Sequence, residues 1–193
     1  MTKTMRLGVA LILGLAFLVT AAPAQAAPAQ AASARGTTAH AAAVRVLRYD
    51  ASRAAEFRSA VDQAAQIWNS SVTNVRLVAG TPADVVVLAD NGWPRALPTG
   101  LGRGTVWMGR QATSQGYNPL RIATHELGHI LGLPDRRTGL CSDLMSGSSA
   151  GVSCTNPYPN AAEKAEVQRN FAGFAPAIDF GEIFVDIPEL AVP

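Results

Sequence analysis

The chain has 193 residues, of which 48% are hydrophobic, so it has the length of one domain and enough apolar side chains for a packed core. Its formal net charge is only +2 and it contains no run of basic residues, which excludes the strongly basic surface of a typical nucleic-acid-binding protein. We therefore expect no nucleic-acid partner.

The first 26 residues have the three parts of a secretory signal peptide. Lys3 and Arg6 provide its positive start, residues 9–19 form an apolar stretch, and residues 24–26 offer a small-x-small cleavage site. The apolar stretch is shorter than the roughly 20 residues that cross a membrane, so a permanent anchor is the weaker alternative. We predict that the chain is secreted, has no membrane association once residues 1–26 are removed, and acts outside the cell as a monomer.

Residues 27–43 are rich in alanine and lack hydrophobic periodicity, which predicts a short pro-segment or linker. The domain is predicted to begin with a strand over residues 44–49, where apolar and polar side chains alternate. Asp50 and Ser52 could cap the helix that follows over residues 53–69. An apolar stripe on that helix is expected to face the core.

Further strands are predicted over residues 75–78, 83–88 and 104–108. The stretch before the last of them is predicted to be a loop, because it contains Gly92, Pro94, Pro98 and Gly100.

Two more helices are predicted in the second half of the chain. The first spans residues 119–131, with Asn118 or the earlier Ser114 as its cap. The second spans residues 161–171, with Asn160 as its cap. The chain between these helices has the composition of a loop.

The last 20 residues differ in composition from the rest of the chain. Residues 174–193 contain acidic and hydrophobic side chains but no Lys or Arg. This acidic-hydrophobic tail is either a disordered end or a segment that docks on the domain.

The helix predicted over residues 119–131 carries residues typical of a metal site. His125 and His129 are four residues apart, so their imidazoles lie on one helix face and can bind one Zn²⁺. Glu126 can face a zinc-bound water as general base. Gly132 allows a sharp turn after the helix, which brings Asp135 back toward the metal.

The number of histidines limits the choice of third ligand. The chain has only three, and His40 lies in the predicted pro-segment or linker. The third ligand is then Asp or Glu, and the turn favours Asp135. Glu163 or Glu166 on the last helix is the alternative. Three protein ligands would leave the fourth position of a single catalytic zinc ion open for water.

Two cysteines and a methionine follow the ligand motif. An even count of cysteines in a secreted chain predicts a disulfide between Cys141 and Cys154, and their spacing fits no zinc-binding pattern. Met145 lies in a short segment bounded by Ser and Gly, which indicates a Met-turn beneath the metal.

The motif over residues 125–135, together with Met145, resembles the snapalysin family, the small secreted neutral zinc endopeptidases of Streptomyces and relatives. The resemblance extends to residues 64–71 and 153–160 and covers about residues 44–171. Aspartate as third ligand is typical of that family within the metzincin-like clan.

The resemblance implies an α+β fold, a metzincin-like zinc protease domain over residues 44–173. Its twisted mixed β-sheet would be accompanied by an N-terminal helix, an active-site helix, a Met-turn and a C-terminal helix. It implies that His125, His129 and Asp135 bind zinc and that Glu126 is the general base. The strand before the active-site helix would form a sheet edge that holds an extended substrate.

The resemblance also implies the Cys141–Cys154 disulfide, cleavage of protein or peptide substrates on the amino side of aromatic residues, and bound calcium in some members. The loops around Asp84, Asp90 and Asn91 offer oxygen atoms but match no calcium-ligand pattern. If the strand over residues 104–108 is the edge, Trp107 or Met108 borders the cleft; otherwise they pack in the core.

The chain departs from the family pattern at one position. Family members commonly carry Tyr two residues after the Asp ligand, where it is thought to stabilise the tetrahedral intermediate. This chain has Arg136 and Arg137 at that point. Arg137 could donate to the oxyanion or point to solvent. We therefore predict a secreted zinc endopeptidase, and the alternative is a secreted zinc-binding protein that lacks turnover.

Overall fold

The computed structural model describes residues 43–188. The predicted signal peptide, the predicted pro-segment or linker up to residue 42 and the last five residues of the tail lie outside the described residues. No helix in the described part has the length and hydropathy needed to cross a membrane.

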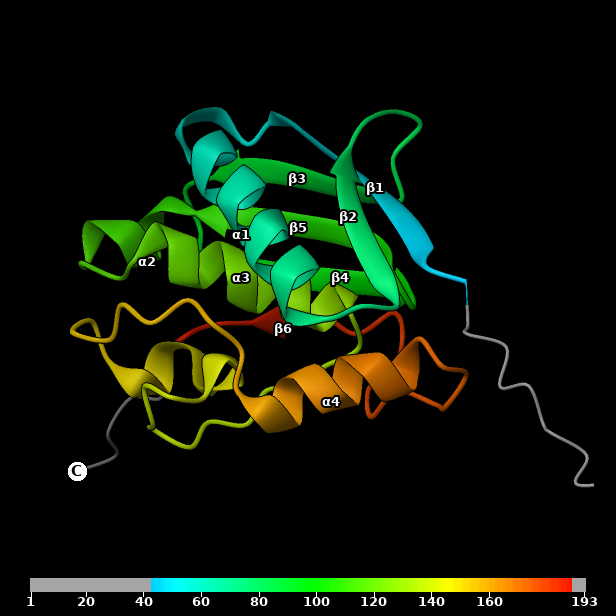
Figure 1. The fold of residues 1–193 in the computed structure, drawn as a ribbon. Coiled ribbons are helices and arrows are strands. Elements are labelled where there is room, and N and C mark those ends of the chain that lie inside the picture. Colours follow the sequence, from blue (N-terminus) through cyan, green and yellow to red (C-terminus); the bar gives the residue numbers. More distant parts are fainter. Residues whose placement is uncertain (1–42, 189–193) are drawn as a thin grey trace, which may run out of the picture. The chain divides into compact units, whose positions relative to one another are not determined.

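The centre of the domain is a mixed six-stranded sheet with the strand order β2-β1-β3-β5-β4-β6 (Figure 1). The first four strands in that order run parallel, whereas β4 is antiparallel to both β5 and β6. The strands are β1 (Arg45–Arg53), β2 (Val75–Ala79), β3 (Val85–Asp90), β4 (Arg95–Gly100), β5 (Arg103–Gly109) and β6 (Phe184–Val185). The expected mixed α+β fold is confirmed.

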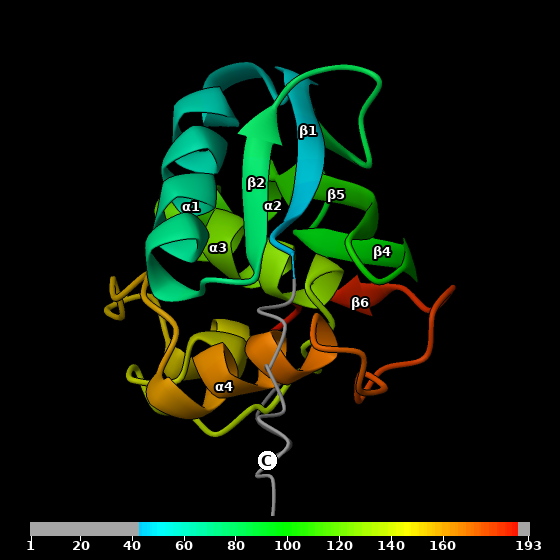
Figure 2. The ribbon, with the colours of Figure 1, turned by 45° about the vertical axis from the view of Figure 1, so that its right-hand side comes forward.

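Two helices pack against each other on one side of this sheet (Figure 2). Trp68 joins them, because its buried indole donates to the Thr124 carbonyl at 2.9 Å. The helical elements are η1 (Ala55–Phe57), α1 (Arg58–Ser71), α2 (Arg110–Ser114), α3 (Pro119–Ile130), η2 (Leu144–Ala150) and α4 (Ala161–Asn170), and the packed pair is α1 and α3. The buried apolar side chains between helices and sheet form one continuous core.

The prediction of a sheet edge at residues 104–108 is wrong. This strand, β5, lies between β3 and β4, and Met108 is fully buried and packs in the core. The segment predicted to be a loop contains β4, in which Pro98 pairs with Gly104. A proline has no N–H to donate, so it is tolerated near the edge of a sheet. Only the two-residue strand β6 lies beyond β4.

The predicted cap of the first helix is also wrong. Asp50 and Ser52 belong to β1, which continues to Arg53 because it pairs with β3 there. The helix α1 begins only at Arg58, after the short turn η1, and has no side-chain cap.

The caps of the later helices agree with the prediction. Asn118 accepts from the Arg121 N–H at 3.0 Å at the start of α3, whereas Ser114 lies in α2. At the start of α4, Asn160 and Glu163 form a reciprocal capping box. Both helices therefore begin where local hydrogen bonds fix them.

The described part of the tail docks on the domain. Residues 184–185 form β6 beside β4, and Figure 1 shows this strand in red between β4 and α4. The Gly181 N–H donates to the Pro98 carbonyl at 2.8 Å. Of the two alternatives for the tail, docking is confirmed for residues 174–188.

Candidate metal centre

Helix α3 carries the first three groups of the site on its buried face. His125, Glu126 and His129 are each at most 1% exposed. The four-residue spacing brings the two imidazole Nε2 atoms to 3.1 Å from each other. The rings meet edge to face at 87°.

The other ring nitrogen of each histidine has a backbone partner. His125 Nδ1 lies 3.0 Å from the Leu144 carbonyl, and His129 Nδ1 lies 2.8 Å from the Leu133 carbonyl. A carbonyl only accepts, so these contacts assign the proton to Nδ1 in both rings. When both rings are neutral, the two Nε2 lone pairs face the same point, an arrangement that is repulsive unless a proton or a metal cation lies between them.

A Schellman turn after α3 brings the third group to that point. Gly132 has a φ of +90°, its N–H donates to the His129 carbonyl, and the Leu133 N–H donates to the Gly128 carbonyl. Asp135 Oδ1 then lies 3.4 Å from His125 Nε2 and 3.7 Å from His129 Nε2.

The residues fit a zinc ion. Asp135 Oδ1 and both carboxylate oxygens of Glu126 are buried without a hydrogen-bond partner among the described residues. A buried carboxylate oxygen without a partner is destabilising unless a cation satisfies it. Two imidazole nitrogens and one carboxylate oxygen match the donor set of a catalytic zinc site with one open position.

The electrostatics of the site call for positive charge. Burial raises the pKa of Glu126 well above its ordinary value, and the neighbouring carboxylates of Asp186 and Asp135 raise it further. Burial lowers the pKa of His129 to about 3, and the charge of His125 adds to this effect. Burial also acts to lower the pKa of His125, but Asp186 and the contact with Asp135 outweigh it and raise that pKa to about 9. A divalent cation would supply the positive charge that a proton on His125 otherwise provides.

Met145 lies under the helix that carries the histidines. It is fully buried, and a Cβ at Gly128 would come within 2.7 Å of its sulfur. Glycine at 128 therefore allows the thioether to touch the helix backbone between the two histidines. The Met145 N–H donates to Glu163 at 2.8 Å, and its carbonyl accepts from the Arg136 N–H at 2.8 Å.

The two alternative ligands on the last helix are not brought to the histidines. Glu163 accepts from the Met145 and Asn160 N–H groups. Glu166 is paired with Arg136. Among residues 43–188, the metal-capable side chains that converge at this point are those of His125, Glu126, His129, Asp135 and Asp186.

Arg137 lies inside the site, so the expectation that it could point to solvent is wrong. Its guanidinium donates to Asp135 Oδ2 at 3.1 Å, to Asp186 Oδ1 at 2.7 Å and to the Val185 carbonyl at 3.0 Å. Sequence reasoning missed Asp186. The signal that could have indicated it was the acidic tail without basic residues, which complements the pair Arg136 and Arg137.

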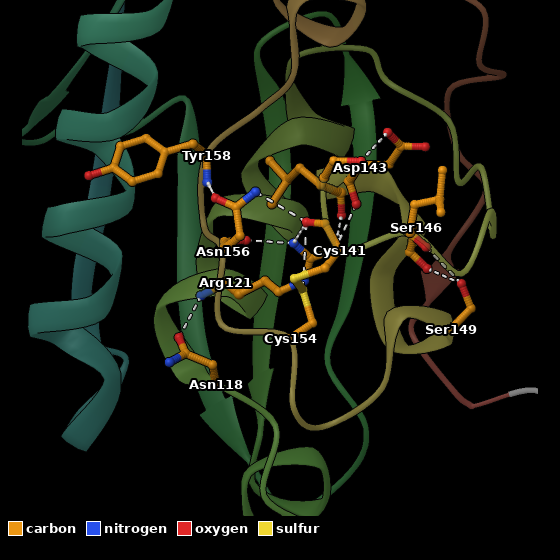
Figure 3. The surroundings of a disulfide bond; sticks show 12 residues. Asn118, Arg121, Cys141, Asp143, Ser146, Ser149, Cys154, Asn156 and Tyr158 are labelled. Carbon is orange, nitrogen blue, oxygen red and sulfur yellow. Dashed lines mark hydrogen bonds between the residues drawn. A yellow bond between two sulfur atoms is a disulfide. The ribbon is translucent and has the colours of Figure 1, made fainter.

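The predicted disulfide between Cys141 and Cys154 is present, with a Cα–Cα distance of 5.4 Å. Figure 3 shows that Arg121 of α3 reaches into the loop that the disulfide closes. The buried guanidinium donates to the carbonyls of Asn156 at 2.5 Å and Asp143 at 2.7 Å, and more weakly to that of Cys141. Arg121 therefore fixes the disulfide loop to the helix of the metal site, a role that sequence reasoning did not find.

A small pocket of about 10 Å³, which is room for about one water molecule, opens beside His125. It lies between α3 and η2, and Tyr117, Ile122, Gly147 and Asp186 contribute to its lining.

Comparison with known proteins places these residues in a family context. A family model described as the Streptomyces extracellular neutral proteinase (M7) family matches residues 43–173. The extracellular small neutral protease of Streptomyces sp. (strain C5) is 46% identical over 142 residues, which are 72% of this chain and 61% of the relative. That of Streptomyces caespitosus is 48% identical over 126 residues, 64% of this chain and 95% of the relative. The chain thus spans only about three-fifths of the first relative.

Among solved structures, the archaemetzincin of Methanopyrus kandleri is similar with a TM-score of 0.45 and 13% sequence identity. The similarity covers 70% of this chain and 99% of that chain.

Proposed function

The chain belongs to the Streptomyces extracellular neutral proteinase (M7) family, and on that premise we propose that it is a zinc-dependent endopeptidase. One observation carries the proposal: two imidazole nitrogens and the carboxylate of Asp135 converge on a point beside a buried carboxylate without a partner, Glu126. A closed structural zinc site would have no need of that fourth group.

Each residue has a separate role in this proposal. His125, His129 and Asp135 would hold the zinc ion. Zinc in such a site lowers the pKa of a coordinated water toward about 7 and polarises a peptide carbonyl. Glu126 would take the proton of the attacking water and pass it to the leaving amine. Met145 gives the helix a rigid apolar floor.

Arg137 is the proposed donor to the oxyanion. A guanidinium is always charged and can stabilise negative charge that develops on a carbonyl oxygen. In this structure its two terminal nitrogens donate to the side chains of Asp135, Ser148 and Asp186 and to the Val185 carbonyl. These hydrogen bonds favour the second candidate function, a secreted zinc-binding protein without turnover. In that function Arg137, which replaces the tyrosine of the family pattern, would not stabilise an oxyanion.

The proposed substrates are proteins or peptides outside the cell, as the relatives are named extracellular proteases. The proposed preference for an aromatic residue on the carboxyl side of the cleaved bond rests on the family resemblance. The pocket beside His125 does not add to it, because its free volume is about 10 Å³ and its lining includes Arg121 and Asp186. For calcium the structure offers no support, since Asp84 and Asp90 are bonded to Arg48 and Arg95.

Hydrolysis of casein by the purified secreted chain tests the proposal. A chelator should abolish hydrolysis and added zinc should restore it. Glu126→Gln should keep zinc bound but lower the rate by about 10²–10⁴-fold, the usual contribution of a general base. Glu56→Gln, an exposed carboxylate in a surface ion pair, is the matched control and should leave the rate unchanged.

Two results would contradict the endopeptidase mechanism: hydrolysis that survives complete removal of zinc, or a Glu126→Gln variant as active as the unsubstituted chain. A third result would favour the second candidate. If the unsubstituted chain holds zinc without cleaving casein and Arg137→Tyr begins to cleave it, the missing tyrosine accounts for the lack of turnover.

A further inference from the structure

The tail lies outside the residues that the family model matches. The family model ends at residue 173, and the tail begins at residue 174. The tail nevertheless reaches the metal site. On its way Pro176 lies against the turn at Gly132, where an added Cβ would come within 2.9 Å of the proline ring.

The backbone of the tail uses the free side of β4. Val185 pairs with Arg95 and Phe184 with Ala96 in antiparallel register. The Asp186 N–H donates to the Pro94 carbonyl at 3.0 Å. Without β6, strand β4 would be the edge of the sheet, and adding a strand to such an edge is how many proteins bind an extended peptide. The tail therefore occupies the position at which an extended peptide would lie beside the metal centre.

The inward-facing side chains of the tail cover the site itself. The ring of Phe184 stacks on His129 with 4.3 Å between ring centroids and an interplanar angle of 19°. Asp186 is 5% exposed and accepts from Arg137 at 2.7 Å and from the Ser148 N–H at 2.8 Å. Its carboxylate lies within 4.8 Å of a ring nitrogen of His125 and a carboxylate oxygen of Glu126.

The outward-facing side chains of the segment are apolar and exposed, in contrast to those that face the site. Ile183 and Ile187 flank residues 184–186 and are 54% and 50% exposed. Burial of an acidic side chain beside two more carboxylates is unfavourable unless a cation pairs with it, and Arg137 provides that pairing. The tail thus presents an aromatic ring to the histidine and a carboxylate to the arginine, while apolar isoleucines stay in solvent. This is a specific binding mode and not general hydrophobic collapse.

We propose that residues 181–187 are an intramolecular ligand of the peptide-binding cleft, and that the cleft accepts a peptide only after this segment leaves. The consequence, a latent protease, rests on the proposed function, whereas the occupancy of the cleft does not. While the segment is bound, the carbonyls of β4 are paired and one face of His129 is covered. Both terminal nitrogens of Arg137 then donate within the protein, and two of these hydrogen bonds go to Asp186 and Val185 of the segment.

Binding of a labelled peptide tests the occupancy without requiring turnover. The probe is a fluorescent synthetic peptide with the sequence of residues 179–188, added to the zinc-loaded full chain carrying Glu126→Gln so that it is not cleaved. In this background, Phe184→Ala and Asp186→Ala, alone and together, should bind the probe at least tenfold more tightly, because they loosen the resident segment. Ile187→Ala, whose side chain is half exposed, is the control and should bind it as weakly as the parent.

Hydrogen exchange shows whether the segment has left. Amides of residues 181–187 and of β4 should exchange faster in the double variant than in the Ile187→Ala control. A released segment with unchanged probe affinity would overturn the proposal, and so would unchanged exchange in variants that fold. If the double variant does not fold, each single variant decides the matter by the same two measurements.

Casein hydrolysis with Glu126 intact separates this proposal from the proposed function. Release of the segment should raise the rate at least tenfold, and the unlabelled peptide of residues 179–188 should lower it again. Equal hydrolysis by the parent and by a variant with a released segment would overturn latency and leave the endopeptidase intact. Tight probe binding by a Glu126→Gln variant, without hydrolysis by the same zinc-loaded variant with Glu126 intact, would overturn the endopeptidase and leave the occupancy intact.

Discussion

Two regions of the domain meet at the metal centre and are held together in different ways. The sheet region, residues 45–130, is built from strands, α1 and α3, and its buried side chains are overwhelmingly hydrophobic. The loop region, residues 131–170, has little regular structure before α4, and its buried polar side chains are nearly as numerous as its hydrophobic ones. A disulfide, Arg121 and Glu163 fix it by specific contacts.

The difference decides how each region contributes to the site. On the sheet side, the helix period alone sets the relation between His125, Glu126 and His129. On the loop side, Asp135 and Met145 are separated by irregular chain, so their positions depend on a few buried hydrogen bonds. Single substitutions in the loop region are therefore expected to have large and separable effects.

Asp135→Ala is expected to have the largest effect, because it removes the proposed zinc ligand that the loop region supplies. The zinc affinity should fall by more than the roughly 10–100-fold that loss of an outer partner of a ligand costs. Metal analysis after dialysis against a graded zinc buffer measures the change. Glu166→Ala is the control, because it removes a carboxylate of the last helix that is paired with Arg136 and does not reach the histidines. Loss of zinc from the control but not from Asp135→Ala would move the third ligand to α4.

The contrast between the regions also decides what could be read from the sequence. The helix α3, its Asn118 cap and the turn at Gly132 follow from local rules, since each depends on residues within one or two turns. The strand β4 does not follow from such rules. Pro94, Pro98 and Gly100 are typical of loops, and the strand forms because β5 and β6 pair with it on both sides.

Local rules also could not predict the contacts of the buried side chains of Asp186 and Arg121. Asp186 meets Arg137 across 49 positions of the chain, and Arg121 meets the disulfide loop across 20 or more. Composition indicated that the tail was acidic, but only the pairing of β6 with β4 brings that charge to the site. Contacts of this length cannot be deduced from periodicity or caps.

Removal of the disulfide is expected to have the next largest effect. The double variant Cys141→Ser/Cys154→Ser should lose on the order of 3 kcal/mol of unfolding free energy, from the greater freedom of the unfolded chain. Urea unfolding at equilibrium measures the loss. Ser142→Ala, an exposed change inside the same loop, is the control. Loss of less than about 1 kcal/mol would mean that Arg121 and the other hydrogen bonds of the loop hold it without the disulfide.

Glu163→Ala tests the polar support of Met145. The Met145 N–H would lose its acceptor and α4 would lose half of its capping box, in a fully buried position. We expect a loss of about 1–3 kcal/mol of unfolding free energy, the usual cost of leaving a buried donor without a partner. Lys164→Ala, at the next position of the helix, is the control. Equal stability of the two variants would show that the Met-turn is held by packing alone.

The smallest expected effect is that of a surface contact in the sheet region, Asp90→Asn. The hydrogen bond from Arg95 lowers the pKa of the Asp90 carboxyl below its ordinary value of 3.8, against the opposing effect of burial and with help from the Gly92 N–H. A folded-state pKa below the unfolded one stabilises the protein at pH values above 3.8, and this contribution is lost as the pH falls through the lower folded-state value. Because the two side chains are 25% and 33% exposed, the contribution should not exceed about 1 kcal/mol.

Urea unfolding at about pH 6 and at about pH 3 measures this contribution, because the pair should stabilise the protein more at the higher value. The unsubstituted chain should lose more stability on acidification than Asp90→Asn, whereas the exposed carboxyl variant Asp179→Asn should behave as the unsubstituted chain does. An equal loss in all three would show that the pair adds nothing. A loss larger than that of Glu163→Ala would overturn the contrast drawn between the two regions, because a partly solvated ion pair in the sheet region would then outweigh a buried polar support of the loop region.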